Sequence, residues 1–189
     1  MLELACGSGQ FTFRLAKQAH RWEATDFSEK MVAEAKKRPG PPNLRFAVRD
    51  ATSLPDTDGT FDAVFIGNAL HIMPKPEKAL AEICHVLKPG GILLAPTFLW
   101  GANGAFRFRA RLMELVGFRV RQRWDADGLA AFVARRGFAV LERDVPSVGD
   151  LAHVLPDRAE TIRRNLLWRM KKSVRRTGCL EKKRTPTTA

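Results

Sequence analysis

The sequence predicts an α/β fold, a three-layer α/β/α sandwich in which helices cover both faces of a mostly parallel central sheet. Strand-like and helix-like segments alternate through roughly the first 145 residues of a 189-residue chain. Helices of about 10–15 residues between successive strands indicate right-handed crossovers, which make the strands parallel. No internal repeat is present in the sequence, so we expect one domain with one core over most of the chain.

Apolar runs and chain-breaking residues mark the individual elements. Ser28 is placed to cap a helix whose apolar face includes Met31 and Ala35, and the prolines after basic residues 36–38 end it. Gly137 follows another helix at the position where a C-terminal glycine belongs. We therefore expect strands at residues 1–4, 22–25, 44–48, 61–67, 91–99 and 139–144, and helices at residues 10–20, 29–38, 76–87, 105–116 and from an Asp125 or Asp127 cap to near residue 136.

Positive charge is concentrated at the end of the chain. Residues 157–189 contribute +8 of the net charge of +12, so residues 1–156 are only mildly basic. Apolar side chains recur there at helical spacing among Arg and Lys, which is typical of a basic amphipathic helix: Ala159, Ile162, Leu166, Met170 and Val174. Such a helix would bind RNA or an anionic membrane surface, or else pack on the body beside a disordered end. We divide the chain into a domain of residues 1–156 and a basic tail of residues 157–189.

The composition excludes several other classes of protein. The sequence contains no run of about 18 uncharged apolar residues and no basic and apolar leader, which favours a cytoplasmic protein. Its three cysteines stand at scattered spacing and match no metal-ligand pattern, so we expect no metal.

Small and acidic residues follow the strands of the first half. Ala5, Gly7 and Gly9 come after the first strand, where small residues let a ligand approach the backbone. Asp26 ends the second strand and Asp50 follows the third. The carboxyl ends of parallel strands share one edge of the sheet, and ligands bind there. An acid about 20 residues after such a loop suits two ribose hydroxyls, and the next acid suits an adenine amine. The pattern predicts a nucleoside site.

The cofactor that fits this pattern best is S-adenosylmethionine rather than a dinucleotide. The dinucleotide fingerprint GxGxxG requires a third Gly or Ala where Thr12 stands, and it needs a helix N-terminus directed at pyrophosphate. Glu3, an acid within the first strand, suits a ligand that carries an ammonium and a sulfonium group.

The chain resembles, from residue 1 to about residue 145, the class I S-adenosylmethionine-dependent methyltransferases, which have a Rossmann-like fold. The stretches that carry the resemblance are LELACGSGQFT, ATDFSEKMVAEAKKR, RFAVRDATSLPDTDGTFDAVFIGNALHIM and ALAEICHVLKPGGILL. They are most similar to the branch related to ubiquinone and menaquinone biosynthesis, which acts on small molecules. The resemblance implies methyl transfer from S-adenosylmethionine to a small-molecule acceptor by direct in-line displacement.

The resemblance also implies which residues bind the cofactor. The set around its methionine end comprises Glu3, Ala5, Gly7, Gly9 and Asn68. The set around its nucleoside comprises Asp26 for the ribose hydroxyls, Phe27 and Met31 beside the adenine, and Asp50 and Ala51 for the adenine edge. Ala5 stands where the family usually has glycine, which is a mild change.

His71, just after the fourth strand, is the candidate general base if the acceptor is a hydroxyl or an acidic carbon. The alternative is that His71 simply begins a loop or helix beside the site. The stretch GNALHIM after this strand has neither the Asn/Asp-Pro-Pro-aromatic motif of base-nitrogen methylation nor a nucleophilic cysteine. A small-molecule acceptor is therefore favoured.

Departures from the family pattern leave alternatives open. Residues 98–124 would form either a lid over the acceptor or a solvated basic helix, and residues 150–155 are a weak candidate for the last strand. Family members carry helices before the first strand, so this chain would be N-terminally truncated and its site partly open. The alternatives to an active small-molecule enzyme are a cofactor-binding remnant that cannot catalyse and an RNA-associated methyltransferase that uses the tail.

Overall fold

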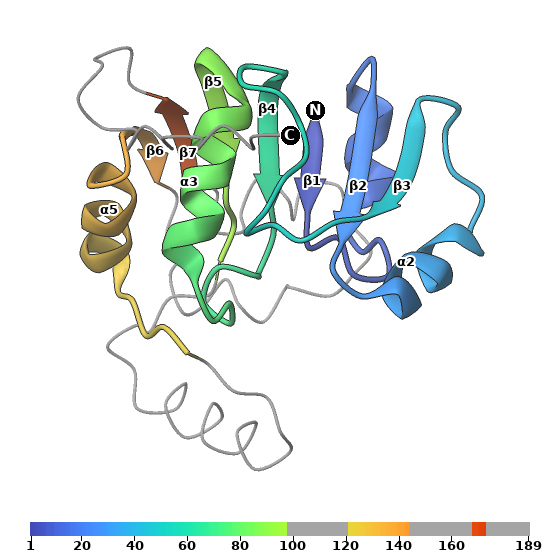
Figure 1. The fold of residues 1–189 in the computed structure, drawn as a ribbon, viewed down its shortest axis with the longest axis horizontal. Coiled ribbons are helices and arrows are strands. Elements are labelled where there is room, and N and C mark those ends of the chain that lie inside the picture. Colours follow the sequence, from blue (N-terminus) through green and yellow to red (C-terminus); the bar gives the residue numbers. More distant parts are fainter. Residues whose placement is uncertain (98–120, 144–167, 173–189) are drawn as a thin grey trace, which may run out of the picture.

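The computed structural model describes residues 1–97, 121–143 and 168–172. A seven-stranded sheet runs through this part of the chain in the order β3-β2-β1-β4-β5-β7-β6. The first five strands pair in parallel, while β7 is antiparallel to both β5 and β6. Figure 1 shows the strands side by side, with α3 and α5 in front of the sheet. The predicted α/β class and the mostly parallel sheet are confirmed.

The bounds of the elements follow the sequence pattern closely in most places. The strands are β1 (Leu2–Leu4), β2 (Trp22–Asp26), β3 (Leu44–Val48), β4 (Phe61–Ile66), β5 (Leu87–Leu94), β6 (Phe138–Arg143) and β7 (Trp168–Lys172). The helices are α1 (Thr12–Leu15), the 3-10 helix η1 (Ala16–Gln18), α2 (Glu29–Lys36), α3 (Pro76–Val86) and α5 (Ala126–Ala134). No helix among these is long and apolar enough to cross a membrane.

Two apolar clusters fill the space on either side of the sheet. Val64 and Ile66 of β4 belong to the cluster that includes buried residues of α3 and α5, whereas Phe65 between them belongs to the cluster that contains Trp22 and Ala16. Successive side chains of a strand point to opposite faces, so one short strand anchors both layers. Each large side chain buried in this way stabilises the fold by about 1.5–3 kcal/mol. The result is the three-layer arrangement that the alternation of elements predicts.

Helix α1 is shorter than the sequence indicates. Instead of a helix over residues 10–20, one turn of α-helix at Thr12–Leu15 passes into the 3-10 helix η1. The N-cap position is Phe11, which has no side-chain acceptor, and the first turn contains no acid. The backbone N–H groups at this end therefore lack the side-chain partners that stabilise a helix start.

Helices α2 and α5 begin at the side chains expected to cap them. Ser28 Oγ accepts a hydrogen bond from Met31 N at 3.4 Å, and Asp125, rather than Asp127, accepts one from Gly128 N at 2.7 Å. The buried residues of α2 are Val32 and Ala35, while Met31 is 39% exposed. Met31 therefore lies at the margin of the apolar face and not within it.

Strand β5 begins at Leu87, four residues earlier than expected. Its pairing with β4 shifts between Phe61↔Leu87 and Ala63↔Ile92, so the KPGG segment forms an irregularity inside the strand. Gly90 adopts a φ of 77°, which glycine tolerates without a steric penalty. The prediction that the KPGG segment interrupts regular structure is correct. The residues on both sides of this segment nevertheless pair with β4.

The helix expected around Met170 is wrong for residues 168–172, which form strand β7. Met170 pairs with Leu93 of β5 on one side and with Val140 of β6 on the other. The N–H and C=O groups that face the gap between these strands must be paired, and an inserted strand pairs them. Five residues of the segment assigned to the basic tail therefore lie in the sheet. The predictions for residues 105–116 and 150–155, and most of the predicted lid and tail, lie outside the described residues.

Candidate functional site

A pocket of about 400 Å³ opens where the order of the strands reverses, beyond the carboxyl ends of the parallel strands. Five of the residues expected to bind a cofactor line it: Ala5, Asp26, Phe27, Asp50 and Ala51. Five further residues line it that the sequence did not single out: Arg49, Thr52, Met73, Pro74 and Lys75. The pocket is thus built from the ends of β1, β2 and β3 and from the segment after β4.

The loop after β1 turns sharply beside the pocket. Ala5, Gly7 and Gly9 have φ values of 54°, 56° and 87°, all in the left-handed region that favours glycine. The Gly7 N–H donates to Asp26 Oδ2 at 2.8 Å, and the Gly9 N–H donates to Cys6 O at 3.0 Å. These bonds hold the loop against the end of β2. Ala5 adopts the glycine-like conformation although it carries a Cβ atom.

We expect Gly9→Ala to destabilise the protein more than Gly7→Ala. A Cβ atom at Gly7 would meet no atom within 4 Å, so this variant bears only the cost of its positive φ, about 1 kcal/mol. At Gly9 the Cβ atom would lie 2.5 Å from Phe13 Cε2, which adds an overlap and brings the cost to about 2 kcal/mol or more. Urea unfolding of both variants measures the difference, and equal free energies of unfolding would contradict this assignment.

Asp26 connects the loop to the start of α2. Its Oδ2 atom accepts from Gly7 N, and its Oδ1 atom accepts from Ser28 N at 2.9 Å. A carboxylate offers about four lone-pair sites, so Asp26 retains the capacity to accept two ligand hydroxyls. Next to it, the side chain of Phe27 is 76% exposed and lines the pocket, where it is accessible to a ligand. Met31 does not line the pocket.

The residues after β3 form a compact turn that also lines the pocket. Asp50 Oδ1 accepts from Thr52 N at 2.8 Å and from Thr52 Oγ1 at 2.9 Å. Ala51 is buried between them at 8% exposure. The turn presents the carboxylate and the neighbouring backbone to the pocket, which suits a ligand edge with both a donor and an acceptor.

Glu3 lies inside the protein and not on the pocket wall. Its side chain is 1% exposed, and Trp22 Nε1 donates to its Oε2 atom at 2.7 Å. Burial raises the pKa of Glu3 to about 7, although the hydrogen bond from Trp22 opposes this. Burial raises the pKa of the nearby Cys6 thiol to about 12, and the negative charges of Glu3 and Asp26 add to this effect. The acid within the first strand is therefore a buried group beneath the loop.

Asn68 and His71 follow β4 but do not line the pocket. Asn68 has a φ of 53°, and its N–H donates to Pro96 O at 2.7 Å. The His71 imidazole is 2% exposed, its Nδ1 atom lies 2.9 Å from Thr97 Oγ1, and burial lowers its pKa. The His71 carbonyl also accepts from the N–H groups of residues 121 and 122. This arrangement favours the structural interpretation of His71 over proton transfer.

The wall formed by Met73, Pro74 and Lys75 was missed because the motif after β4 ends at Met73 and gave none of these three residues a role. They follow β4 and so reach the same edge of the sheet, which is the signal that could have identified them. Within residues 1–97, 121–143 and 168–172, no group of three or more His, Cys, Asp or Glu side chains is arranged to hold a metal ion.

Comparison with known proteins relates this site to methyltransferases. Residues 1–91 match the family model described as a methyltransferase domain. The demethylmenaquinone methyltransferase of Renibacterium salmoninarum is 39% identical over 107 residues, which are 57% of this chain and 44% of that protein. The chain spans less than half the length of the curated relatives that it matches.

Solved structures share the fold over nearly the whole chain. A SAM-dependent methyltransferase of Methanosarcina mazei superposes with a TM-score of 0.69 over 92% of each chain, at 18% identity. The cyclase SpnF superposes with a TM-score of 0.68 at 26% identity, over 92% of this chain and 74% of its own.

Proposed function

We propose that this chain transfers a methyl group from S-adenosylmethionine to a small-molecule acceptor, because residues 1–91 match the model of a methyltransferase domain and a demethylmenaquinone methyltransferase is 39% identical over 107 residues. The observation that carries the proposal is the pocket itself, in which two carboxylates and an exposed aromatic ring stand at the ends of adjacent strands. Carboxylates suit hydroxyl and amine donors, and the ring suits a purine face.

The residues of the pocket fit a cationic nucleoside better than a dinucleotide. Its volume of about 400 Å³ is within the range of small-molecule sites. The Gly7 N–H, a donor that a pyrophosphate would need, already donates to Asp26. Asp26 and Asp50 line the pocket together with the basic residues Arg49 and Lys75, so a nucleoside is favoured by the carboxylates as acceptors for hydroxyl and amine donors and not by net charge. This chemistry supports S-adenosylmethionine as the ligand.

Each wall would then have its own task. We assign the ribose hydroxyls to Asp26, one adenine face to Phe27, and the adenine edge to Asp50 and Ala51. The cofactor supplies a methyl group already activated by its sulfonium, so the chain's own residues need only orient the partners and exclude water. We assign His71 to holding residues 121 and 122 in place rather than to proton transfer.

The Phe27→Ala variant tests the nucleoside assignment. We expect it to weaken S-adenosylhomocysteine binding about 10-fold, because a stacked aromatic ring contributes about 1–3 kcal/mol per base. The free energy of unfolding should change little, since this side chain is 76% exposed. Titration calorimetry measures the affinity, with Leu141→Ala as the control, because Leu141 on β6 is also exposed at 52%. Equal losses in the two variants would argue against a purine at Phe27.

A second candidate function is binding of the cofactor without methyl transfer. The cyclase SpnF has this fold, so the fold alone does not require methyl transfer. One measurement distinguishes the two candidates: the transfer of a labelled methyl group from S-adenosylmethionine to a demethylmenaquinol. Transfer would support the enzyme, whereas tight S-adenosylhomocysteine binding with no transfer to this or other quinols would support the second candidate.

A further inference from the structure

We propose that an ion-pair bridge formed by Glu23, Arg49 and Asp56 positions the loop that reads the adenine. We call residues 49–56 the adenine loop, because Arg49, Asp50, Ala51 and Thr52 all line the pocket. Asp56 lies outside the pocket lining and would act only through Arg49, as a positioning residue. The inference rests on the proposed function, since it takes the ligand to be an adenine nucleoside.

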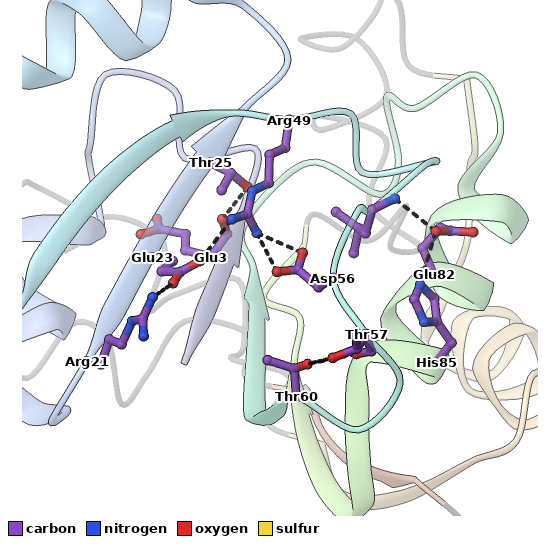
Figure 2. A network of polar contacts seen from close by, with 11 residues as sticks. Glu3, Arg21, Glu23, Thr25, Arg49, Asp56, Thr57, Thr60, Glu82 and His85 are labelled. Atoms are coloured by element: carbon purple, nitrogen blue, oxygen red, sulfur yellow. Dashed lines mark hydrogen bonds and ion pairs between the residues drawn. The ribbon is translucent and has the colours of Figure 1, made fainter.

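The bridge joins the two ends of the adenine loop to each other and to the sheet. Arg49 Nη1 donates to both carboxylate oxygens of Asp56, at 3.0 and 2.7 Å, and Arg49 Nη2 donates to Glu23 Oε2 at 3.1 Å. Figure 2 shows the guanidinium of Arg49 between these two acids, with Arg21 on the far side of Glu23. Glu23 belongs to β2, which lies between β3 and β1, so the bridge ties the far end of the loop to an interior strand of the sheet.

The bridge is shielded from water more than ordinary surface pairs are. The side chains of Arg49, Glu23 and Asp56 are 20%, 12% and 13% exposed. By contrast, both partners of the Lys88–Asp62 pair are largely exposed, at 48% and 77%. Shielded pairs are screened less by solvent, and the planar guanidinium fixes the orientation of its acceptors. The removal of one acid would also leave Arg49 with less compensation for its charge.

The contacts within the loop show what the bridge would hold. The Arg49 N–H donates to Asp26 O at 3.0 Å, so the loop begins beside the residue assigned to the ribose. In the middle of the loop, the Leu54 N–H donates to Glu82 Oε2 of α3 at 2.9 Å. The contact of Asp56 with Arg49 then closes the loop on its own first residue. Closure limits the conformations open to Asp50 and Ala51 before a ligand arrives, which reduces the entropy lost on binding.

The Asp56→Asn variant tests the inference with a ligand-free measurement first. Asparagine keeps the size of the side chain but removes the charge that pairs with Arg49. We expect faster amide hydrogen exchange in peptides that cover residues 49–56 and unchanged exchange in the strands. The matched control is Asp62→Asn, which breaks the exposed Lys88–Asp62 pair on the surface. This variant should change hydrogen exchange neither in residues 49–56 nor in the strands. Unchanged exchange in the adenine loop of Asp56→Asn would overturn the inference, whether or not the protein binds an adenine nucleoside.

Calorimetry with two ligands provides the second measurement. We expect Asp56→Asn to weaken S-adenosylhomocysteine binding by about 10-fold, between the effects of exposed and buried pairs. S-inosylhomocysteine, which lacks the adenine amine, should lose less affinity, so the preference for adenine falls. A global loss of stability would weaken both ligands equally and leave this preference unchanged, which would overturn the inference. Asp56→Glu, which retains the charge, should restore the preference in part.

Failure of the proposed function gives a different result. If the wild-type protein does not bind S-adenosylhomocysteine, the proposed nucleoside site is contradicted. The proposed role of the bridge in adenine recognition is then contradicted as well. If the wild-type protein binds while Asp56→Asn keeps both its affinity and its preference, only the bridge is wrong.

Discussion

Replacement of Asp26 by alanine is expected to weaken S-adenosylhomocysteine binding by about 100-fold or more. Each hydrogen bond to a charged acceptor contributes about 1.5–3 kcal/mol, and two ribose hydroxyls would be lost together. The variant also removes the acceptor of the Gly7 and Ser28 N–H groups, which loosens the loop on the same side of the pocket. Titration calorimetry measures this loss directly.

The control for this prediction is Asp26→Asn, which keeps one side-chain oxygen as an acceptor but no charge. Its affinity should lie between those of the wild type and the alanine variant. An Asp26→Ala protein that is folded by circular dichroism and binds within a factor of about three of wild type would remove Asp26 from the ribose role. Such a result would also weaken the case for a nucleoside ligand.

The stability of the protein is expected to fall as pH rises from about 4.5 to about 7 because of Glu3. Burial raises the pKa of this carboxyl from 4.5 to about 7, so the folded state binds more protons than the unfolded state between these values. Its protonated form is therefore favoured in the fold. The associated stability is fully present below the unfolded pKa and is lost as pH rises through the folded pKa. The cost above pH 7 is about 3 kcal/mol.

The Glu3→Gln variant should therefore be more stable than wild type at pH 8 and nearly equal to it at pH 4.5. Glutamine retains an oxygen that can accept from Trp22 Nε1 and carries no charge to bury. Urea unfolding at both pH values measures the difference. The control is Glu34→Gln, because Glu34 is 55% exposed on α2 and should show no such pH dependence. An identical difference between wild type and Glu3→Gln at both pH values would contradict the role of burial.

These two results bear on the function in different ways. Asp26 tests whether the pocket holds a nucleoside, whereas Glu3 tests only the state of a buried acid beneath the loop. A chain that passes the Asp26 test and transfers methyl to a quinol is a small-molecule methyltransferase. One that passes it without transfer behaves as the second candidate.

The sequence alone determined the class of the fold, and it predicted at which edge of the sheet a candidate site would lie. Alternating apolar segments of distinct period specify strands and helices locally, and small or acidic residues after each strand are visible without coordinates. Ala5, Asp26 and Asp50 were identified in this way, and all three line the pocket. The cap at Ser28 was also predicted, and the second cap was narrowed to Asp125 or Asp127, because a cap depends on residues only three positions apart.

Only the tertiary structure decided which residues line the pocket and which are buried away from it. Glu3 and Asp26 are both acids at strand positions, yet one is buried against Trp22 and the other is on the pocket wall. The strand β7 formed within a helical pattern, because its place is set by the unpaired edges of β5 and β6. The Arg49 bridge joins three residues whose neighbourhood depends on strand order. Contacts of this kind depend on parts of the chain that meet only in the folded state, so no local pattern encodes them.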